Sequence, residues 1–180
     1  MLLMLKAIGS KIDLNDKDFT TYYYLVADLL ESDVVQQMKN YTHHGETTCF
    51  QHCLNVSYYN YKLCGFFSLN ERAGARAGLL HDLFLYDWHT YKCPKGERLH
   101  GFTHAKAALK NAKENFYISD LESDIIEKHM FPLNITALPK YRETLVIVLV
   151  DKYCGLLETV IPRLRKIALL FARHKKSVKE

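Results

Sequence analysis

Residues that interrupt helices are scarce in this chain, which has only 4 Pro and 8 Gly among 180 residues. With so little punctuation, the sequence favours helices over the many tight turns of a sheet protein. Apolar residues also recur every three or four positions, as on one face of a helix, for example at Phe50, Leu54, Tyr58 and Tyr61. We therefore expect an all-α helical bundle preceded by a short N-terminal helical arm.

Capping residues indicate where individual helices start. Thr48 with Gln51 and Ser119 with Glu122 have the form of capping boxes, and Asn70 can cap a third helix. Thr103 can start a fourth, after a polar loop at about residues 86–101. The expected helices lie near residues 17–30, from 32 to about 41, from 48 past 61, from 70 towards 84, from 103 to 116, and from 119 to about 130.

The segment Leu145–Val150 reads LVIVLV, and its β-branching alone would suggest a buried strand. The sequence offers no convincing partner strand, and an isolated strand would leave its backbone groups unsatisfied. We therefore expect a helix at residues 141–159 and a final helix from Pro162, since proline suits a first turn. Residues 1–43 are expected to pack on a domain formed by residues 44–160, with residues 161–180 as a C-terminal helix and basic tail.

Polar residues occupy unusual places on these helices. The chain has 9 His, and several of them, together with two Asp, fall on or next to apolar faces. One buried histidine is commonly a satisfied core residue, but six such groups on five helices would leave unpaired donors and facing carboxylates. A bound cation resolves both problems. The candidate metal ligands are His52, His81, Asp82, His104, His129 and Asp151.

The order and surroundings of these six residues resemble the HD superfamily of metal-dependent phosphohydrolases. The matching stretches are FQHCLNVSYYNYKL, RAGARAGLLHDLFLYDW, LHGFTHAKAALKNAKENF, DIIEKHMFPL and VIVLVDKYCGLLE. The layout is most similar to the HD-type hydrolases that split diadenosine tetraphosphate symmetrically. It departs from theirs at His129-Met130, where a His-Thr pair is usual, and it lacks the GYP signature of the branch that cleaves cyclic di-GMP.

The resemblance implies one or two divalent transition-metal ions, namely Fe, Mn, Zn or Ni. His52, His81, Asp82 and Asp151 would hold the first ion, while His104 and His129 would join Asp82 at the second. The stretch LHGFTH offers both His100 and His104, and we prefer His104 because its distance from Phe116 suits the family helix. His100 could replace it or contact substrate.

The resemblance also implies hydrolysis of a phosphoester or phosphoanhydride in a nucleotide or a related small phosphorylated molecule. Asp82 would bridge the ions, and positive side chains must neutralise the substrate. The candidates are Lys106 and Arg142, as catalytic and substrate-binding residues, and Lys92 and His100, as substrate-binding residues. A non-catalytic nucleotide-binding sensor that keeps the metal site is the alternative. A single structural zinc is disfavoured, because structural zinc sites are rich in Cys.

Other residues have weaker signals. His44 could line the mouth of the site, although a turn residue fits as well, and Asp87 could orient a ligand histidine or lie at the surface. Cys49 and Cys53 are read as core thiols, because a helix aims Cys53 away from His52. His43, His89 and His174 require no special role.

Charge and cysteine content limit the partners and the compartment. A net charge of +4 is spread too thinly for a nucleic-acid binder and suits small phosphorylated molecules better. Five Cys without a CxxC pair favour a reducing, cytoplasmic setting. No segment has the length of a membrane span, and the N-terminal MLLMLKAIG could dock on the domain or touch a membrane surface. Homodimerisation is left open.

Overall fold

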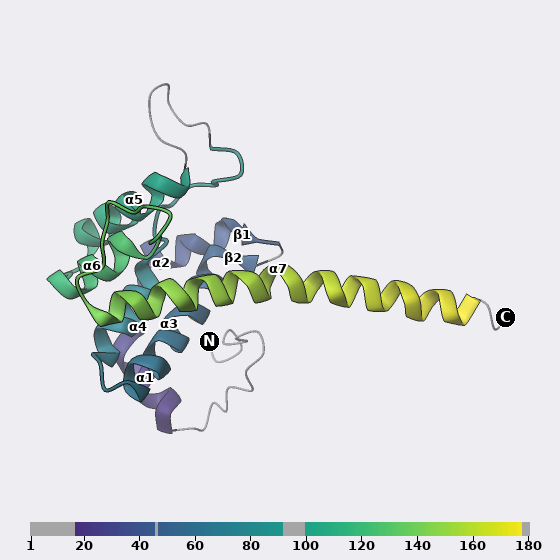
Figure 1. Ribbon diagram of the computed structural model, residues 1–180, viewed down its shortest axis with the longest axis horizontal. Coiled ribbons are helices and arrows are strands. Elements are labelled where there is room, and N and C mark those ends of the chain that lie inside the picture. Colours follow the sequence, from purple (N-terminus) through teal and green to yellow (C-terminus); the bar gives the residue numbers. More distant parts are fainter. Residues whose placement is uncertain (1–16, 46, 92–99, 178–180) are drawn as a thin grey trace.

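The protein is a bundle of helices with one small hairpin, in agreement with the predicted all-α class (Figure 1). The computed structural model describes residues 17–45, 47–91 and 100–177, so the expected N-terminal arm lies outside the described residues. The elements in chain order are α1 (Lys17–Leu30), α2 (Asp33–Gln36), the 3-10 helix η2 (Gln37–Asn40), β1 (Thr42–His44), β2 (Thr47–Thr48), α3 (Cys49–Phe66), α4 (Glu71–Leu80), α5 (His100–Asn115), α6 (Asp120–Lys128) and α7 (Arg142–Ser177).

Helices α3 and α4 form the centre of the bundle and pack closely against each other. A Cβ added at Gly78 would lie 2.8 Å from Ser57 Cα, so this helix pair requires glycine there. Glycine has no Cβ, so the two backbones can approach this closely. Both helices supply buried apolar side chains to the core, including Leu54, Val56, Leu79 and Leu80.

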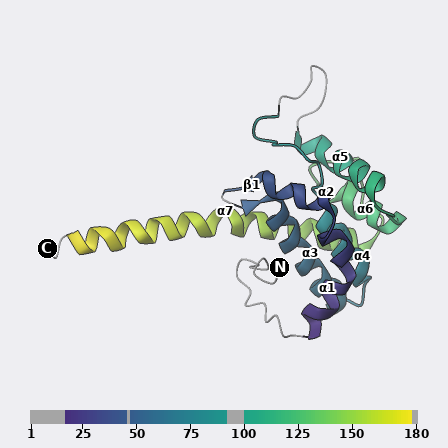
Figure 2. The ribbon, with the colours of Figure 1, turned by 180° about the vertical axis from the view of Figure 1, so that it is seen from behind.

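The N-terminal helix α1 is tied to this centre by polar contacts. Tyr22 Oη donates to Ser57 Oγ at 2.9 Å, and both side chains are buried. The buried Arg76 of α4 reaches Asp28 on α1, where Nη2 lies 2.9 Å from Oδ2, and its Nε lies 3.4 Å from Glu122 Oε1 on α6. One guanidinium therefore connects α1, α4 and α6. Figure 2 shows these helices from behind.

The predicted helix caps are present, with one difference. Ser119 and Glu122 form a complete capping box at the start of α6, and Asn70 Oδ1 accepts from Ala73 N at the start of α4. Thr48 Oγ1 accepts from Gln51 N, but the Gln51 side chain donates to Asn55 Oδ1 instead of returning to the cap. The first predicted box is therefore only half formed.

Three expectations about element boundaries were wrong. Helix α5 begins at His100, not at Thr103, and residues 42–48 form the antiparallel pair β1–β2 although no strand was expected. Helix α7 continues through Pro162 instead of restarting there. Proline lacks the N–H that would bond to the carbonyl of Glu158 four residues earlier. That carbonyl faces Gly45 of the hairpin turn, where an added Cβ would lie 3.4 Å from the oxygen.

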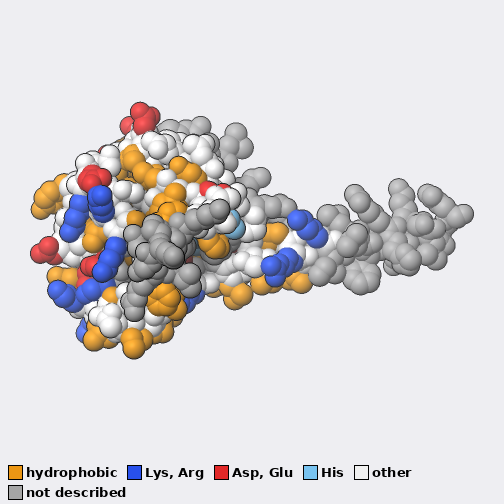
Figure 3. Space-filling model, turned by 90° about the horizontal axis from the view of Figure 1, so that it is seen from above, with side chains coloured by type: hydrophobic (Ala, Val, Ile, Leu, Met, Phe, Trp, Pro, Cys, Tyr) orange, Lys and Arg blue, Asp and Glu red, His pale blue; other side chains and the backbone are white. Residues whose placement is uncertain are grey.

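The C-terminal half of α7 extends beyond the bundle (Figures 1 and 2). Seen from above, Lys and Arg side chains are scattered over the body and along α7, and do not gather in one patch (Figure 3). Among the described residues, no helix combines the length and the apolar character needed to cross a lipid bilayer.

Candidate metal centre

Five helices bring the six predicted ligands to one place. His52 lies on α3, His81 and Asp82 follow the end of α4, His104 lies on α5, His129 ends α6, and Asp151 lies on α7. The first five side chains are buried, and that of Asp151 is 15% exposed. The geometry thus unites residues that are separated by up to 99 positions in the sequence.

Two of the histidines are oriented by the ends of their own helices. His81 and His129 are C-cap residues of α4 and α6. The Nδ1 of His81 donates to Gly78 O, and that of His129 donates to Ile126 O, each at 2.8 Å. A backbone carbonyl only accepts, so each Nδ1 carries a proton and each Nε2 is left to face the cluster.

His52 is held by a carboxylate that the sequence did not reveal as part of the site. Its Nδ1 lies 2.8 Å from Glu158 Oε2, and its Nε2 lies 3.1 Å from Asp151 Oδ1. Asn55 Nδ2 donates to the other oxygen of Glu158 at 2.8 Å, so the buried carboxylate is fixed from both sides. A carboxylate behind a ligand histidine sets its tautomer and increases its basicity.

Asp82 divides the cluster into two halves. Its Oδ1 lies 3.3 Å from His104 Nε2 and 3.6 Å from His129 Nε2. Its Oδ2 lies 3.3 Å from His81 Nε2 and 3.2 Å from His43 Nε2. Each oxygen therefore faces a different set of imidazoles, which is the arrangement that a carboxylate shared by two cations requires.

Several polar atoms in this cluster fit a cation better than they fit one another. Among the described residues, His81 Nε2 and Asp82 Oδ1 are buried and make no hydrogen bond. The Nε2 atoms of His104 and His129 lie only 2.9 Å apart, so one proton must be shared between two lone pairs. Neutral imidazole and carboxylate are ligands for Fe, Mn, Zn and Ni, and the residues present fit such ions.

The ionisation states differ between the imidazoles of the cluster. Burial and the neighbouring imidazoles of His81 and His104 lower the pKa of His129 to about 3, so the His129 imidazole is neutral at pH 7. Burial raises the pKa of the Asp82 carboxyl, but His81 and the other imidazoles outweigh it and hold that pKa well below the usual range. Burial lowers the pKa of His52, whereas Asp151 and Glu158 raise it to about 10. A cation binding at His52 must therefore displace a proton.

Two of the predicted substrate-binding residues are exposed at the surface. Lys106, two residues after His104, is exposed, and so is Arg142 at the start of α7. Lys92 and the side chain of His100 lie outside the described residues, as does the side chain of His44. Their contacts with substrate stay predictions.

The structure also shows the surroundings of Asp87 and Cys53, for which the sequence left two roles open. The Asp87 side chain is 43% exposed, and its Oδ1 accepts from the backbone N of His89 at 3.0 Å, so it orders its own loop. Ligand atoms of Cys53, His81 and Asp82 lie within 4.8 Å of one another. Burial and the neighbouring Cys49 raise the pKa of the Cys53 thiol well above its usual value, which keeps it protonated and disfavours a ligand role.

Sequence reasoning missed Glu158, Asn55 and His43. Glu158 follows Asp151 by two helical turns, a spacing that places both on one face of α7, and Asn55 follows His52 by one turn. These spacings were a usable signal. His43 was assigned no special role, and it enters the cluster through the β1–β2 hairpin, for which no pattern was recognised.

One comparison with known proteins gave a match. A family model described as the HD domain matches residues 49–167, which is well over half of the chain. The matched segment includes all six predicted ligands and Glu158, and it begins after His43. No curated protein and no solved structure matches the chain.

Proposed function

Because the chain belongs to the HD-domain family, as its sequence resemblance predicted, we propose that it is a metal-dependent phosphohydrolase. The substrate class is a phosphoester or phosphoanhydride of a nucleotide or a related small phosphorylated molecule. The observation that carries this proposal is Asp82, whose two oxygens face separate sets of imidazole nitrogens. Such a centre suits two cations that share one carboxylate.

In this proposal, His52, His81, Asp82 and Asp151 hold a first ion, and Asp82, His104 and His129 hold a second. Bound divalent transition-metal ions would supply Lewis-acid activation of water and neutralise charge on the phosphoryl group. The chain supplies imidazole and carboxylate donors at fixed positions in a buried setting, where electrostatic interactions are stronger than in bulk water. Binding of the first ion would release the proton that His52 carries.

Other residues of the chain would act around the ions. Glu158 holds the Nδ1 proton of His52, so that Nε2 can face a cation. Lys106 and Arg142 remain our candidates for charge neutralisation of the substrate, with Lys92 and His100 as further contacts. We also propose the domain limits of residues 44–160, a cytoplasmic location, and no nucleic-acid partner.

The alternative is a sensor that keeps the metal site and binds a nucleotide without turnover. The two functions share the same ligand set and differ in whether a bound nucleotide is cleaved.

The test begins with the metal content of protein purified without chelator, measured by elemental analysis. We expect between one and two transition-metal ions per chain, and no bound metal in Asp82→Ala. Protein loaded with Mn or Fe is then incubated with nucleoside mono- and diphosphates and dinucleoside polyphosphates. Hydrolysis that disappears in Asp82→Ala supports the enzyme, whereas tight binding of one compound without turnover identifies a sensor. A wild-type protein that binds no metal refutes both.

A further inference from the structure

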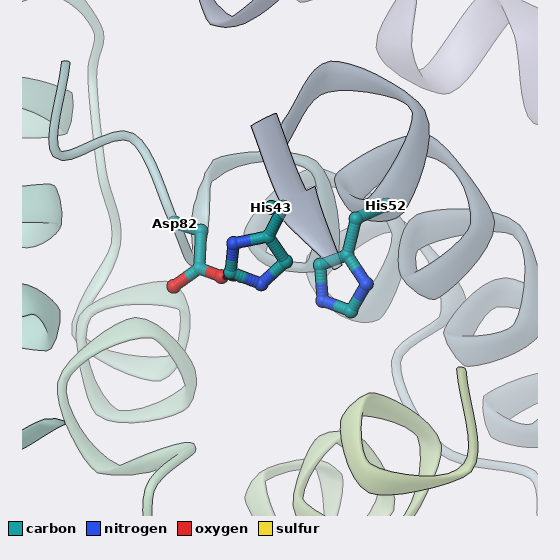
Figure 4. Close-up of side chains that lie close together, drawn as sticks. All are labelled: His43, His52 and Asp82. Carbon is teal, nitrogen blue, oxygen red and sulfur yellow. Dashed lines mark ion pairs between the residues drawn. The ribbon is translucent and has the colours of Figure 1, made fainter. Parts of the chain in front are cut away.

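The His43 side chain reaches the cluster from outside the matched family segment. It belongs to β1, is only 8% exposed, and its Nε2 lies 3.2 Å from Asp82 Oδ2. In the view of Figure 4, its ring lies between the Asp82 carboxylate and the His52 ring. The β1–β2 hairpin therefore brings His43 Nε2 to Asp82, the carboxylate at the centre of the site.

The position of this nitrogen assigns it to one half of the cluster. Asp82 Oδ2, which His43 faces, is also the oxygen nearest to His81 Nε2, whereas Oδ1 faces the other two histidines. Ligand atoms of His43, His52 and Asp82 all lie within 4.8 Å of one another. Two donors bound at about 2.1 Å to one ion are at most about 4.2 Å apart, so only a small shift would complete this triad.

The His43 ring is held in place by its neighbours. Its centroid lies 4.4 Å from that of His52, and the rings of Phe84 and Trp88 lie at 6.3 and 6.4 Å. The strand itself is paired with β2, and the backbone N of Cys49 donates to Tyr41 O at 2.8 Å. A donor fixed in this way loses little conformational entropy when it binds a cation.

We propose that His43 is a further ligand of the first metal ion, contributed by the β1–β2 hairpin beside His52 and Asp82. This inference rests on the proposed function, because it assumes that the first ion binds at this half of the cluster. With His43, the first ion has five protein donors, and a six-coordinate ion keeps a single position for water or substrate. Such a set favours Mn, Fe, Co or Ni over tetrahedral Zn.

The experiment compares His43→Ala with wild type in the Co(II)-loaded protein. We expect binding of the first Co(II) to weaken at least about tenfold, with the second ion unaffected. We also expect stronger visible absorption, because loss of a donor lowers the coordination number of cobalt. Proton NMR should lose one of the paramagnetically shifted N–H resonances that arise from coordinated imidazoles.

His89→Ala is the matched control, because His89 is exposed on the loop after α4 and contacts Asp87. It should leave both Co(II) affinities and the spectra unchanged, and retained binding of the second ion in His43→Ala shows that the variant is folded. If wild type binds two ions and His43→Ala matches it in affinity and spectrum, the inference is wrong and the proposed function stands. Weaker binding without a lost imidazole resonance also overturns it, since His43 would then only position Asp82. If wild type binds no Co(II), the proposed function fails.

Discussion

Glu158→Gln tests whether the carboxylate behind His52 controls metal binding. In wild type, one carboxylate oxygen accepts from His52 Nδ1 and the other accepts from Asn55 Nδ2, both at 2.8 Å. Glutamine has nearly the same shape but replaces one of these acceptors by an NH2 donor. The substitution therefore changes the hydrogen-bonding pattern with little change of volume.

Neither orientation of the new amide satisfies both partners. If the NH2 group faces His52, the imidazole must accept at Nδ1, and its remaining proton moves to Nε2, the atom that should face the cation. If the NH2 group faces Asn55, that side chain must turn over and lose its bond from Gln51 Nε2, which is 3.0 Å long in wild type. The first orientation opposes metal binding directly. The second keeps the His52 tautomer, but it loses the Gln51–Asn55 hydrogen bond and places a neutral amide where a carboxylate increased the basicity of His52.

The expected magnitude follows from the role of such carboxylates. Loss of a partner behind a ligand histidine weakens metal affinity about 10- to 100-fold, or about 1.4–2.7 kcal/mol. For a chain of this size, 1 kcal/mol corresponds to about 2–4 °C in Tm, so the stabilisation by metal should shrink by roughly 3–10 °C. The difference between metal-loaded and metal-free Tm separates this effect from any loss of stability in the metal-free fold.

The assay is competition for Mn(II) or Co(II) with a chelator, together with thermal unfolding at fixed metal concentration. Glu114→Gln is the matched control, because its carboxylate is 58% exposed on α5 and its ion pair is with Lys110. This control should bind metal as wild type does. Equal metal affinities for wild type and Glu158→Gln would refute the role assigned to Glu158.

Three further predictions concern packing, capping and thiol chemistry. Gly78→Ala should lower the free energy of unfolding by about 1–3 kcal/mol or more in urea titrations, because its Cβ would collide with the Ser57 backbone, whereas Gly101→Ala meets only an ordinary contact. Asp124→Ala should cost about 1–3 kcal/mol, because the buried Asp124 carboxylate accepts bonds from the start of α7 and the turn before it. Burial raises the pKa of Asp124, but Lys128, the Thr144 hydroxyl and the Lys140 amide together hold it below its usual value. The stabilisation is therefore present above the unfolded pKa of about 3.9 and is lost as pH falls through the folded pKa, so the deficit of the variant should shrink in acid. Cys53→Ala should leave metal content unchanged in elemental analysis, and a loss of metal would make this thiol a ligand.

The sequence predicts those parts of the fold that local rules determine. Ser119 and Glu122 sit three residues apart before an apolar run, and that pattern alone specifies the start of α6. The helical character of residues 145–150 also followed, because no partner strand was available. The start of α5 at His100 and the hairpin at residues 42–48 depend on packing between segments, which neither propensity nor periodicity describes.

The candidate metal centre also has a part that the sequence predicts and a part that depends on packing. His52, His81 and Asp82 could be proposed from their place on apolar helix faces, because a buried polar group needs a partner wherever the helices meet. The partners behind them are harder to propose. A carboxylate such as Glu158 is recognised only when the rotation of α7 relative to α3 is known, although its seven-residue spacing from Asp151 narrows the choice.

Glu158 also links Pro162 with His43, although no sequence pattern connects these two residues. Its side chain holds His52, while its carbonyl is the one that Pro162 leaves without an N–H donor from four residues on. Gly45 lies against that carbonyl with a φ of 59°, a conformation that glycine tolerates and that lets the hairpin turn approach α7. His43 is two residues earlier on the same hairpin. The continuity of α7 at Pro162 therefore lets one residue support His52 through its side chain and receive, at its backbone, the turn that brings His43 to Asp82.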